Sequence, residues 1–477
     1  MAALMDLEVE QMDVKAIFLL GDLEEEIYVE QPKGFRALDQ EDLSEIPTES
    51  NDFHIVEISS LLTDSNCSHS ATVSSKEEGL KLFHKYGPCS PSKHGKANAP
   101  SVRQILEGDQ TRLNFKQQSK LYGENTVKVK LDSSNTFEYA VNVGLGTPKK
   151  ELTLVMDTGS SLIWTQCQPC KLGSYHGCYK QADPIFDPSK SSTYINVTCP
   201  SHTCSLTNTT LGFTTCSSTS TCEYAEAYLD GSSLAGYLAK ERLSVGSDTF
   251  DDTIFGCAEF NANVSVAGTD GILGMDRGFL SFVEQTSSTY QRVFSYCLPS
   301  KASEIGFLKF GKAKPVSKSL KFTQLGASYS INIVGIKLGN TKLPIAFQKG
   351  TASIDSGTVI TRLPTKDYIT LREAYRKAMS HYQLAKPFVI LDTCYHVGSL
   401  LKLKIPKMSF LFADGLVLDL PPIGLAFPIN SNLVCLPFAP YPGGVDRVLF
   451  GNFQQKTLEI VYDVAGGKFG FGYGGCK

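Results

Sequence analysis

The sequence predicts an all-β fold built from two related lobes, and three observations carry that prediction. From about residue 136 onward, short runs of β-branched and aromatic residues such as ELTLVMD and LEIVYDV are separated by turn residues. The chain has 40 glycines and 22 prolines, and few long segments with helical periodicity. One motif also occurs twice, about 200 residues apart, which indicates a duplicated lobe rather than a short repeat.

The composition of the 477 residues excludes several classes of protein. Its 42% of hydrophobic and 20% of charged residues are ordinary for a chain that buries large cores. No apolar run approaches the roughly 18 residues that a membrane span needs. Residues 1–60 carry 16 acidic and 3 basic side chains, which leaves a net charge of only +9 spread over the rest of the chain. We therefore expect no membrane span and no specific nucleic-acid partner.

Cysteine usage indicates an oxidising compartment. Twelve of the 14 cysteines follow residue 160, and such an even number favours disulfides. Zinc is the alternative, because two of these cysteines form a C-x-x-C, but no second such pair or spaced histidine pair follows, and we expect no metal. The twelve are Cys167, Cys170, Cys178, Cys199, Cys204, Cys216, Cys222, Cys257, Cys297, Cys394, Cys435 and Cys476. Four glycosylation sequons, at Asn66, Asn196, Asn208 and Asn263, agree with a secreted chain.

Two helices are expected. In the basic, weakly patterned residues 53–135, Ser101 is a candidate cap that precedes an apolar face formed by Val102, Ile105 and Leu106. This helix is interpreted either as a solvated linker or as part of a removable prosegment over an acidic cleft. The second helix, TKDYITLREAYRKAMSHY, has Thr365 as its expected cap. Its apolar side is formed by Tyr368, Leu371, Tyr375 and Ala378.

The repeated motif carries the candidate chemistry. LTLVMDTGSSLIW at 152–164 and ASIDSGTVITRL at 352–363 share an apolar run, an acidic residue, a hydroxyl residue and a glycine. Each copy is followed about a hundred residues later by two apolar residues and a glycine, at Gly274 and Gly451. We therefore expect each lobe to contribute one carboxylate, Asp157 or Asp355, to a shared cleft.

Paired carboxylates of this kind activate water. Two carboxylates roughly 3 Å apart share one proton, so the ionised member accepts a proton from water while the other polarises a substrate carbonyl. No metal, cofactor or covalent intermediate is required. A single D-T-G is often only a turn, whereas two copies with the same flanking pattern indicate a catalytic pair. The expected supports are the two glycines and the neighbouring hydroxyls, namely Thr158, Gly159, Ser160, Ser356, Gly357 and Thr358.

From about residue 53 to its end, the chain resembles the atypical plant aspartic proteases of the pepsin superfamily, the nepenthesin and chloroplast-nucleoid protease type. The resemblance rests on LFHKYGPCSP, VGLGTPKKELTLVMDTGSSLIWTQCQPC, PIFDPSKSSTY, IDSGTVITRLP and GNFQQKTLEIVYDVAGGKFGFGYGGC. It implies the bilobal pepsin fold, with Asp157 and Asp355 as catalytic residues. It further implies a monomer with lobes at 136–320 and 321–477, whose inhibitory prosegment, within 53–135, is cleaved near residues 120–137.

The resemblance also assigns a mobile flap. Tyr228 matches the flap tyrosine, and Trp164 matches the tryptophan whose indole N–H reaches it, although core packing alone would also explain Trp164. Leu229 departs from the family, which usually has glycine there, and this puts turnover and subsite preference in question. The implied disulfides are Cys167–Cys170, Cys178–Cys257, Cys199–Cys222, Cys204–Cys216, Cys297–Cys476 and Cys394–Cys435.

The N-terminal residues resemble something else. Residues 5–36 are similar to part of a copia-type retrotransposon reverse transcriptase, in which Asp13 would match a palm carboxylate. Such a fragment is too small for a core or a metal site, so residues 1–52 are interpreted as a fused segment without polymerase activity. No secretory signal precedes it. We expect a functional form with another leader before Phe53, secreted or sent to the vacuole or chloroplast.

Three functions were weighed for the chain. The first is an acid endopeptidase acting on peptides or proteins. The second is a catalytically silent binding protein of the same fold, like the plant inhibitors of microbial glycoside hydrolases. The third is DNA binding, which the 31 basic and 27 acidic residues of positions 131–477 disfavour. Because both acidic motifs are intact, the sequence favours the peptidase.

Overall fold

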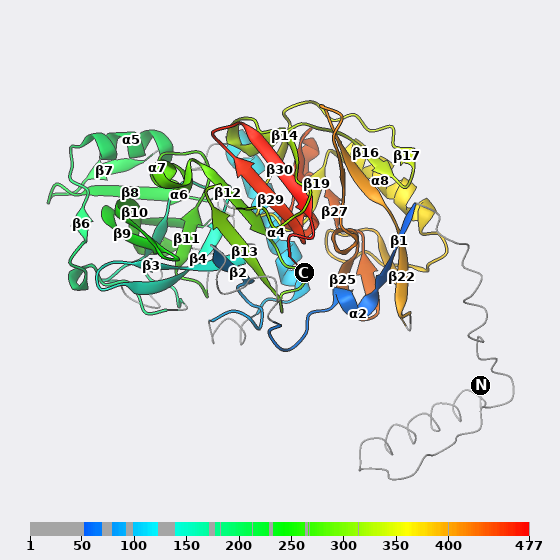
Figure 1. Ribbon diagram of the computed structural model, residues 1–477, viewed down its shortest axis with the longest axis horizontal. Helices are drawn as coiled ribbons and strands as arrows, with labels where there is room; N and C mark the ends of the chain where they lie inside the picture. The colour runs from blue at the N-terminus through cyan, green and yellow to red at the C-terminus, as the bar shows by residue number, and fades with distance from the viewer. Residues whose placement is uncertain are drawn as a thin grey trace, which may run out of the picture. The chain divides into compact units, whose positions relative to one another are not determined.

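A computed structural model of the chain confirms the predicted all-β, bilobal fold (Figure 1). The segment that resembles a reverse transcriptase lies outside the described residues, as does most of the expected cleavage interval. The structure describes residues 52–68, 79–91, 99–122, 139–170, 177–181, 183–211, 213–228, 232–262, 266, 268–312, 314–398 and 400–476.

One large sheet forms the first lobe and continues into the second. Its strands alternate apolar and polar positions where one face meets water, and are apolar throughout near the centre. The order is β14 (Lys321–Gln324), β30 (Lys468–Tyr473), β29 (Leu458–Asp463), β12 (Val293–Cys297), β13 (Ile305–Phe310), β2 (Leu80–His84), β3 (Tyr139–Leu145), β4 (Lys150–Asp157), β11 (Gly271–Gly274), β5 (Trp164–Gln166), β10 (Asp248–Ala262), β9 (Ser233–Val245), β8 (Cys222–Ala227) and β7 (Thr214–Cys216), with β6 (Ile195–Asn196) on β9.

Smaller sheets complete the second lobe. The sheet that carries the second acidic motif has the order β15 (Ser330–Ile331), β18 (Ala352–Ile354), β28 (Val448–Phe450), β19 (Thr361–Leu363) and β27 (Phe438–Pro440). The others are β17 (Thr341–Lys342), β16 (Ile333–Leu338), β23 (Met408–Phe412) and β24 (Val417–Asp419); β20 (Leu384–Ala385), β21 (Cys394–His396), β26 (Leu433–Cys435) and β25 (Phe427–Asn430); and β1 (Phe53–Glu57) with β22 (Lys402–Pro406).

Helices are few and mostly short. They are α2 (Ile58–Leu61), α4 (Val102–Tyr122), α5 (His202–Leu211), α6 (Phe282–Gln285), α7 (Ser287–Tyr290), α8 (Thr365–Ala378) and α9 (Asn452–Gln455). Within the described ranges, none of the helices is long and apolar enough to cross a membrane.

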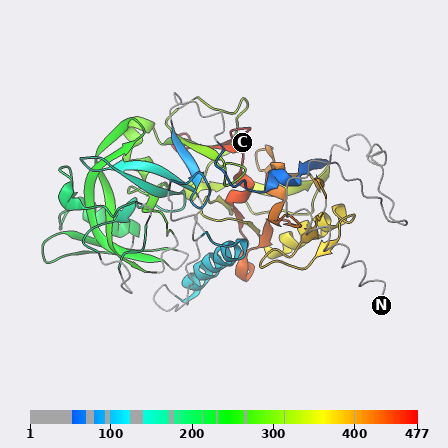
Figure 2. The same ribbon diagram turned by 90° about the horizontal axis from the view of Figure 1, so that it is seen from below.

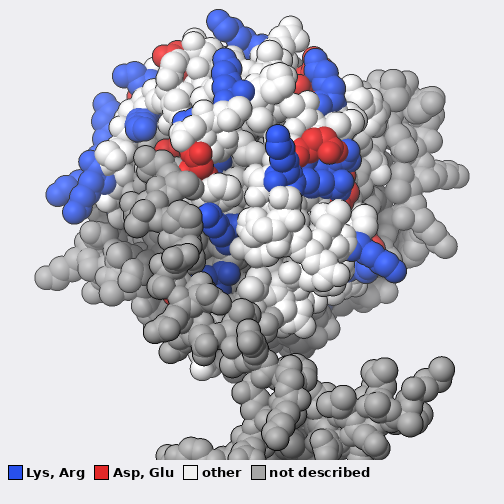
Figure 3. Space-filling model, turned by 90° about the vertical axis from the view of Figure 1, so that its right-hand side faces the viewer, with Lys and Arg blue, Asp and Glu red and all other residues white. Residues whose placement is uncertain are grey.

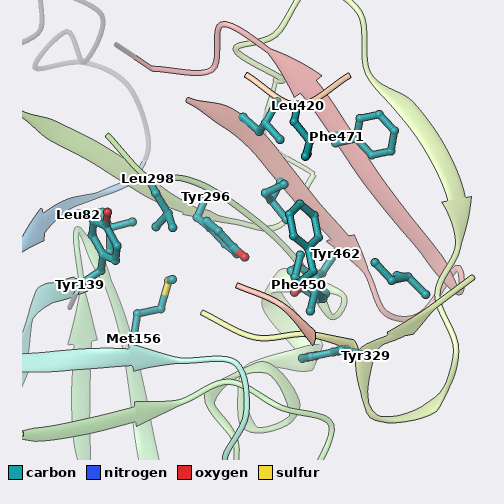
Figure 4. Packing of buried hydrophobic residues seen from close by; sticks show 14 of the residues in the cluster. Leu82, Tyr139, Met156, Tyr296, Leu298, Tyr329, Leu420, Phe450, Tyr462 and Phe471 are labelled. Carbon is teal, nitrogen blue, oxygen red and sulfur yellow. The ribbon is translucent and has the colours of Figure 1, made fainter. Parts of the chain in front are cut away.

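A single apolar core joins the two lobes. Figure 4 shows Tyr296 between Met156 of the first lobe and Phe450 of the second, and all three belong to one buried cluster. Tyr462 stacks on Phe294, with ring centroids 4.5 Å apart, which adds geometric specificity to the apolar burial. The two acidic loops are therefore anchored to one packed interior.

The residues before the first lobe are integrated into the body. Strand β1 pairs with β22 of the second lobe, and β2 lies between β13 and β3 in the central sheet. Cys67 and Cys89, which the sequence analysis left unpaired, form a disulfide within this segment. The described parts of this segment are therefore part of the folded body, and the interpretation of its helix as a solvated linker is wrong, since Leu106 and Leu113 are buried.

The two predicted helices form, with one correction. In α4, the Ser101 Oγ accepts from the Gln104 N–H while the Gln104 Oε1 accepts from the Ser101 N–H, a capping box that fixes where the helix begins. In α8, Thr365 is the first helical residue and Pro364 is the cap, so the predicted Thr365 cap is wrong. Pro364 has no side-chain acceptor, and its backbone carbonyl instead accepts from the N–H groups of Asp367 and Tyr368.

Two of the six implied disulfides are confirmed and four are wrong. Cys297–Cys476 and Cys394–Cys435 form as expected. The others are instead Cys167–Cys257, Cys170–Cys178, Cys199–Cys216 and Cys204–Cys222.

Backbone pairing explains these corrections. The N–H of Cys167 donates to the carbonyl of Ala258, so Cys167 lies beside β10 and next to Cys257 rather than folding back on Cys170. Cys216 and Cys222 are register partners on β7 and β8, and their two disulfides lie in contact, with the sulfurs of Cys199 and Cys204 3.8 Å apart. Four sulfurs so close together allow several pairings, which sequence spacing does not distinguish.

The surface features match a chain without a concentrated charge. Figure 3 shows Lys and Arg scattered among neutral residues on the face it presents, with Asp and Glu between them. Asn66, Asn196 and Asn208 are exposed, whereas Asn263 lies outside the described residues.

Candidate active site

The duplicated motif forms two equivalent loops, each held by a parallel strand. Asp157 ends β4, where it lies opposite Gly274 of β11. In the second lobe, Ile354 of β18 lies opposite Phe450 of β28, and the N–H of Asp355 donates to the Phe450 carbonyl. The predicted pairing of each acidic motif with its trailing apolar-apolar-glycine is therefore present in both lobes.

The trailing glycines are required by close backbone contact. A Cβ on Gly274 would lie 2.5 Å from the carbonyl carbon of Ser161, and one on Gly451 would lie 2.7 Å from the carbonyl oxygen of Val359. Ser161 and Val359 each stand four residues after the acidic residue of their motif, so the two contacts are equivalent. Only glycine allows the strands to pass at this distance.

Two hydroxyl residues join the loops across the lobes. The Thr158 N–H donates to the Ser356 Oγ at 3.2 Å, and the Ser356 N–H donates to the Thr158 Oγ1 at 3.3 Å. Both were expected to hold the carboxylates, and that expectation is corrected, since their hydroxyls meet each other instead. The reciprocal bonds keep the two acidic side chains at a fixed separation.

Backbone amides and one hydroxyl orient the carboxylates. The Gly159 N–H donates to Asp157 Oδ1 at 2.9 Å, and the Gly357 N–H donates to Asp355 Oδ1 at 2.8 Å. The Thr358 hydroxyl donates to Asp355 Oδ2 at 2.8 Å, as expected. Ser160, its counterpart, stands close enough to lower the pKa of Asp157, but its hydroxyl is outside hydrogen-bonding geometry with the described residues.

The two carboxylates converge on one point. A Cβ built on Gly159 would lie 3.3 Å from Asp157 Oδ1 and 3.7 Å from Asp355 Oδ1. The pKa of Asp157 is raised to about 6, chiefly by burial; the guanidinium of Arg112 lowers it, and the nearby Asp355 raises it by a smaller amount. The pair therefore retains a proton in mildly acidic solution, and that proton belongs to the pair rather than to either residue.

The sequence analysis missed the amides that hold the second loop. The Asn452 Nδ2 donates to the Ser356 carbonyl at 3.1 Å, and the Gln455 Nε2 donates to the carbonyls of Asp355 and Phe450. Both side chains are fully buried on α9. Their only signal in the sequence is a run of amides, GNFQQ, directly after the second trailing glycine.

The flap residues meet as expected. Strands β8 and β9 form an antiparallel hairpin that leads to Tyr228, whose N–H donates to the Ser232 carbonyl. The indole Nε1 of Trp164 donates to the Tyr228 hydroxyl at 2.8 Å. Burial raises the pKa of that hydroxyl, so it stays protonated. Leu229 lies outside the described residues.

Helix α4 places a cation against the second carboxylate. The Arg112 Nη2 lies 3.2 Å from Asp355 Oδ2, and both side chains are almost completely buried. About one helical turn before Arg112, the carboxylate of Asp109 accepts hydrogen bonds from Arg362 Nη2 at 2.6 Å and from the Val359 N–H at 2.8 Å. Neither Asp109 nor Arg112 was predicted from the sequence to be a site residue.

Apolar residues on the same face of α4 fix its position. Leu106 is fully buried in a cluster with Val359, Ile360 and Phe453, and Leu113 packs on Tyr441 and Leu449. Figure 2 shows α4, in cyan, beside the orange strands of the second lobe. The face that contacts the body repeats every three to four residues, as one side of a helix does.

An open cavity remains beside the two loops. It has a volume of about 420 Å³ and is lined by residues of both motifs, including Thr158, Gly159, Ile354 and Asp355. Its rim includes the exposed Arg447. The carboxylates are therefore covered by α4 while an adjoining part of the cleft stays accessible.

Comparisons with known proteins agree with this geometry. Residues 139–312 match the family model described as xylanase inhibitor N-terminal, and residues 328–473 match xylanase inhibitor C-terminal. An aspartyl protease family protein of Arabidopsis thaliana is 43% identical over 89% of this chain and 94% of its own length. The chain belongs to the plant aspartyl proteases of the pepsin superfamily. Within that family, it is also similar to aspartic proteinase nepenthesin-1 of Nepenthes gracilis, at 32% identity over 71% of this chain and 78% of the relative.

Solved structures of more distant plant proteins share the fold. The crystal structure described as edgp matches with a TM-score of 0.59 at 19% identity, over 71% of this chain and 92% of that one. Basic 7S globulin from soybean matches with a TM-score of 0.57 at 18% identity, over 70% of this chain and 92% of that one. At these identities, the similarity to the solved structures shows a shared fold and nothing about activity.

Proposed function

We propose that this aspartyl protease family member is an active aspartic endopeptidase. The observation that carries the proposal is the convergence of Asp157 Oδ1 and Asp355 Oδ1 on one point, each oriented by the N–H of its following glycine. The names of the relatives, most of them proteases, support the same activity.

In the proposed reaction, water binds between the two carboxylates. The ionised member accepts a proton from the water as it attacks the substrate carbonyl carbon, and the protonated member donates a hydrogen bond to the carbonyl oxygen. The resulting tetrahedral intermediate collapses when the leaving nitrogen is protonated. Tyr228 closes over the substrate, held by the Trp164 indole.

We further propose that the chain is made as a zymogen. Arg112 neutralises Asp355, and α4 covers the second-lobe side of the carboxylates, where a peptide would otherwise bind. Release of this helix would remove the cation and open the cleft. Two buried ion pairs join α4 to the body, Arg112 with Asp355 and Asp109 with Arg362. Breaking either pair leaves a charge without its partner, and this opposes release of the helix.

The proposed route to maturity is secretory. Seven disulfides join all 14 cysteines, and such a framework forms in oxidising compartments. The exposed Asn66, Asn196 and Asn208 are the proposed glycosylation sites.

A silent binding protein is the second candidate. The descriptions of the matching family models and the seed-globulin neighbours favour it. Both acidic motifs and both glycine amides are present, however, and these support catalysis rather than binding alone.

Substitution of the pair tests the proposal. In acid-treated protein, Asp157→Asn and Asp355→Asn should each lower peptide cleavage by about 10³-fold while the near-UV circular dichroism stays unchanged, because each removes the shared proton site. Asp252→Asn, at an exposed position on β10, serves as the matched control variant. Retention of more than a tenth of the activity by either Asn variant contradicts the proposal.

A further inference from the structure

Arg362 occupies a special position in the duplicated fold. It lies on β19, seven residues after Asp355, and is opposite Leu449 of β28. Trp164 holds the equivalent position in the first lobe, seven residues after Asp157 and opposite Ile272 of β11. The first-lobe residue supports the flap, whereas its second-lobe counterpart is a cation with no exposed surface.

Among the described residues, every acceptor of the Arg362 guanidinium comes from α4. Nη2 donates to Asp109 Oδ2 at 2.6 Å, and Nη1 donates to Gln110 Oε1 at 2.8 Å. Nε is buried and has no acceptor among the described residues. Removal of the helix on activation would leave this cation facing the open cleft without a carboxylate partner, so a ligand that supplies a carboxylate can take the place of Asp109.

The vacated site lies close to the reacting carboxylates. Asp109 and Arg112 are three residues apart on α4, which corresponds to about 4.5 Å along a helix axis, and Arg112 contacts Asp355. An extended peptide advances about 3.3 Å per residue, so one or two residues span the same distance. Leu106, three residues before Asp109 on α4, packs in an apolar cluster with Val359 and Ile360.

We propose that Arg362 is a specificity-determining residue that binds the carboxylate of an Asp or Glu side chain in the peptide substrate. This inference rests on the proposed peptidase function. The acidic residue lies one or two positions from the cleaved bond, and its carboxylate replaces that of Asp109. A guanidinium fork matches a carboxylate with two parallel hydrogen bonds, which an uncharged side chain does not reproduce.

The test compares matched peptides on the acid-treated enzyme, after mass spectrometry shows that residues 99–122 have been released. Peptides carry Glu or Gln at each position within three residues of the cleaved bond, on both sides. At pH 5 a Glu side chain, with its ordinary pKa of about 4.3, is ionised. At one position near the bond, Glu should raise kcat/KM at least tenfold over Gln.

Two variants separate a specific site from a general charge effect. Arg362→Met should abolish the preference for Glu while cleavage of the Gln peptides continues, which also shows that the variant folds. Arg447→Met removes a cation from the cavity rim and should leave the preference intact. If Arg362→Met does not fold, wild-type enzyme is instead inhibited with a synthetic peptide of residues 99–122. Its Asp109→Asn version should then bind about tenfold more weakly.

The outcomes distinguish the two levels of the argument. Cleavage without any Glu preference, an equal loss of preference in both arginine variants, or equal inhibition by the two synthetic peptides would overturn the role of Arg362 alone. An active enzyme that retains α4 would also overturn it, because Arg362 would keep Asp109 as its partner. Absence of all peptide cleavage would overturn the proposed function, and this inference with it.

Discussion

The two lobes use the same backbone pattern to hold an acidic residue, but they close the cleft in different ways. In the first lobe, Trp164 donates to Tyr228 of a hairpin that belongs to the same lobe. In the second, Arg362 at the equivalent position donates to Asp109 and Gln110 of α4, which precedes both lobes in the chain. The residue in the first lobe therefore contacts a hairpin of the same lobe, whereas the residue in the second lobe contacts a helix that lies outside both lobes.

The difference shows which positions of a duplicated fold are the same in both lobes and which can differ. The paired loops, the trailing glycines and the parallel strands are equivalent in the two lobes, because catalysis needs two matched carboxylates. The residue seven positions after each carboxylate is free to differ, since it faces the cleft rather than the partner loop. A buried cation there needs a counter-charge, and Asp109 of α4 provides it.

The largest expected effect concerns the docking of α4 on the second lobe. Asp109→Ala leaves a fully buried Arg362 without its carboxylate, so docking of α4 should weaken by about 3–5 kcal/mol. In the full chain at pH 7, limited proteolysis should then cut α4 rapidly, and peptide cleavage should appear without acid treatment. Glu107→Ala is the matched control, because Glu107 pairs only with the exposed Arg103 on the same helix. If proteolysis cuts α4 at the same rate in the two variants, the ion pair of Asp109 with Arg362 does not hold α4 on the second lobe.

The pH dependence of the matured enzyme gives the next effect. Because burial raises the pKa of Asp157 to about 6, the pair holds its shared proton below that pH and loses it above. Peptide cleavage should therefore be greatest in acid and fall by up to roughly tenfold per unit once the pH exceeds the pKa of the pair. Release of α4 removes the charge of Arg112, which lowers the pKa of Asp157, but it also exposes the carboxylate to water and so reduces the burial that raises this pKa. Activity that stays flat up to pH 8 would be incompatible with a shared proton.

The smallest effect sharpens the first-lobe side of the comparison. Trp164→Phe removes the donor to the Tyr228 hydroxyl, a hydrogen bond with a net value of about 1 kcal/mol. We expect kcat/KM to fall several-fold for all peptides alike. Tyr228→Phe in the same background should add little, because the two residues act through one bond. A change in the preference between Glu and Gln peptides would show that the two lobes do not divide their roles in this way.

Much of the catalytic centre could be predicted because its signal is local in sequence. The acidic motifs, their trailing glycines and the flap tyrosine each occur in a short segment whose geometry is nearly independent of the rest. The strands around Asp157 and Asp355 were expected for that reason, whereas the contact of Trp164 with Tyr228, 64 residues apart, was expected from the family resemblance.

The remaining features depend on contacts between distant segments. Arg362 and Asp109 are 253 residues apart, and although Arg362 lies near the end of the second repeated motif, nothing in that motif indicates its partner. The disulfides of Cys199 and Cys204 depend on strand register, which spacing along the chain does not define. Thr158 and Ser356 were assigned to the carboxylates because each follows one in sequence, whereas the approach of the two lobes brings their hydroxyls together.

One experiment tests the central claim most directly. The disulfide-bonded full chain is purified at pH 7, moved to pH 4, and followed by mass spectrometry together with cleavage of a peptide library, with and without the aspartic protease inhibitor pepstatin. We predict that loss of the segment containing α4 precedes the appearance of peptide cleavage, and that pepstatin blocks that cleavage. A chain that has lost α4 and still cleaves no peptide between pH 3 and pH 6 would contradict the account.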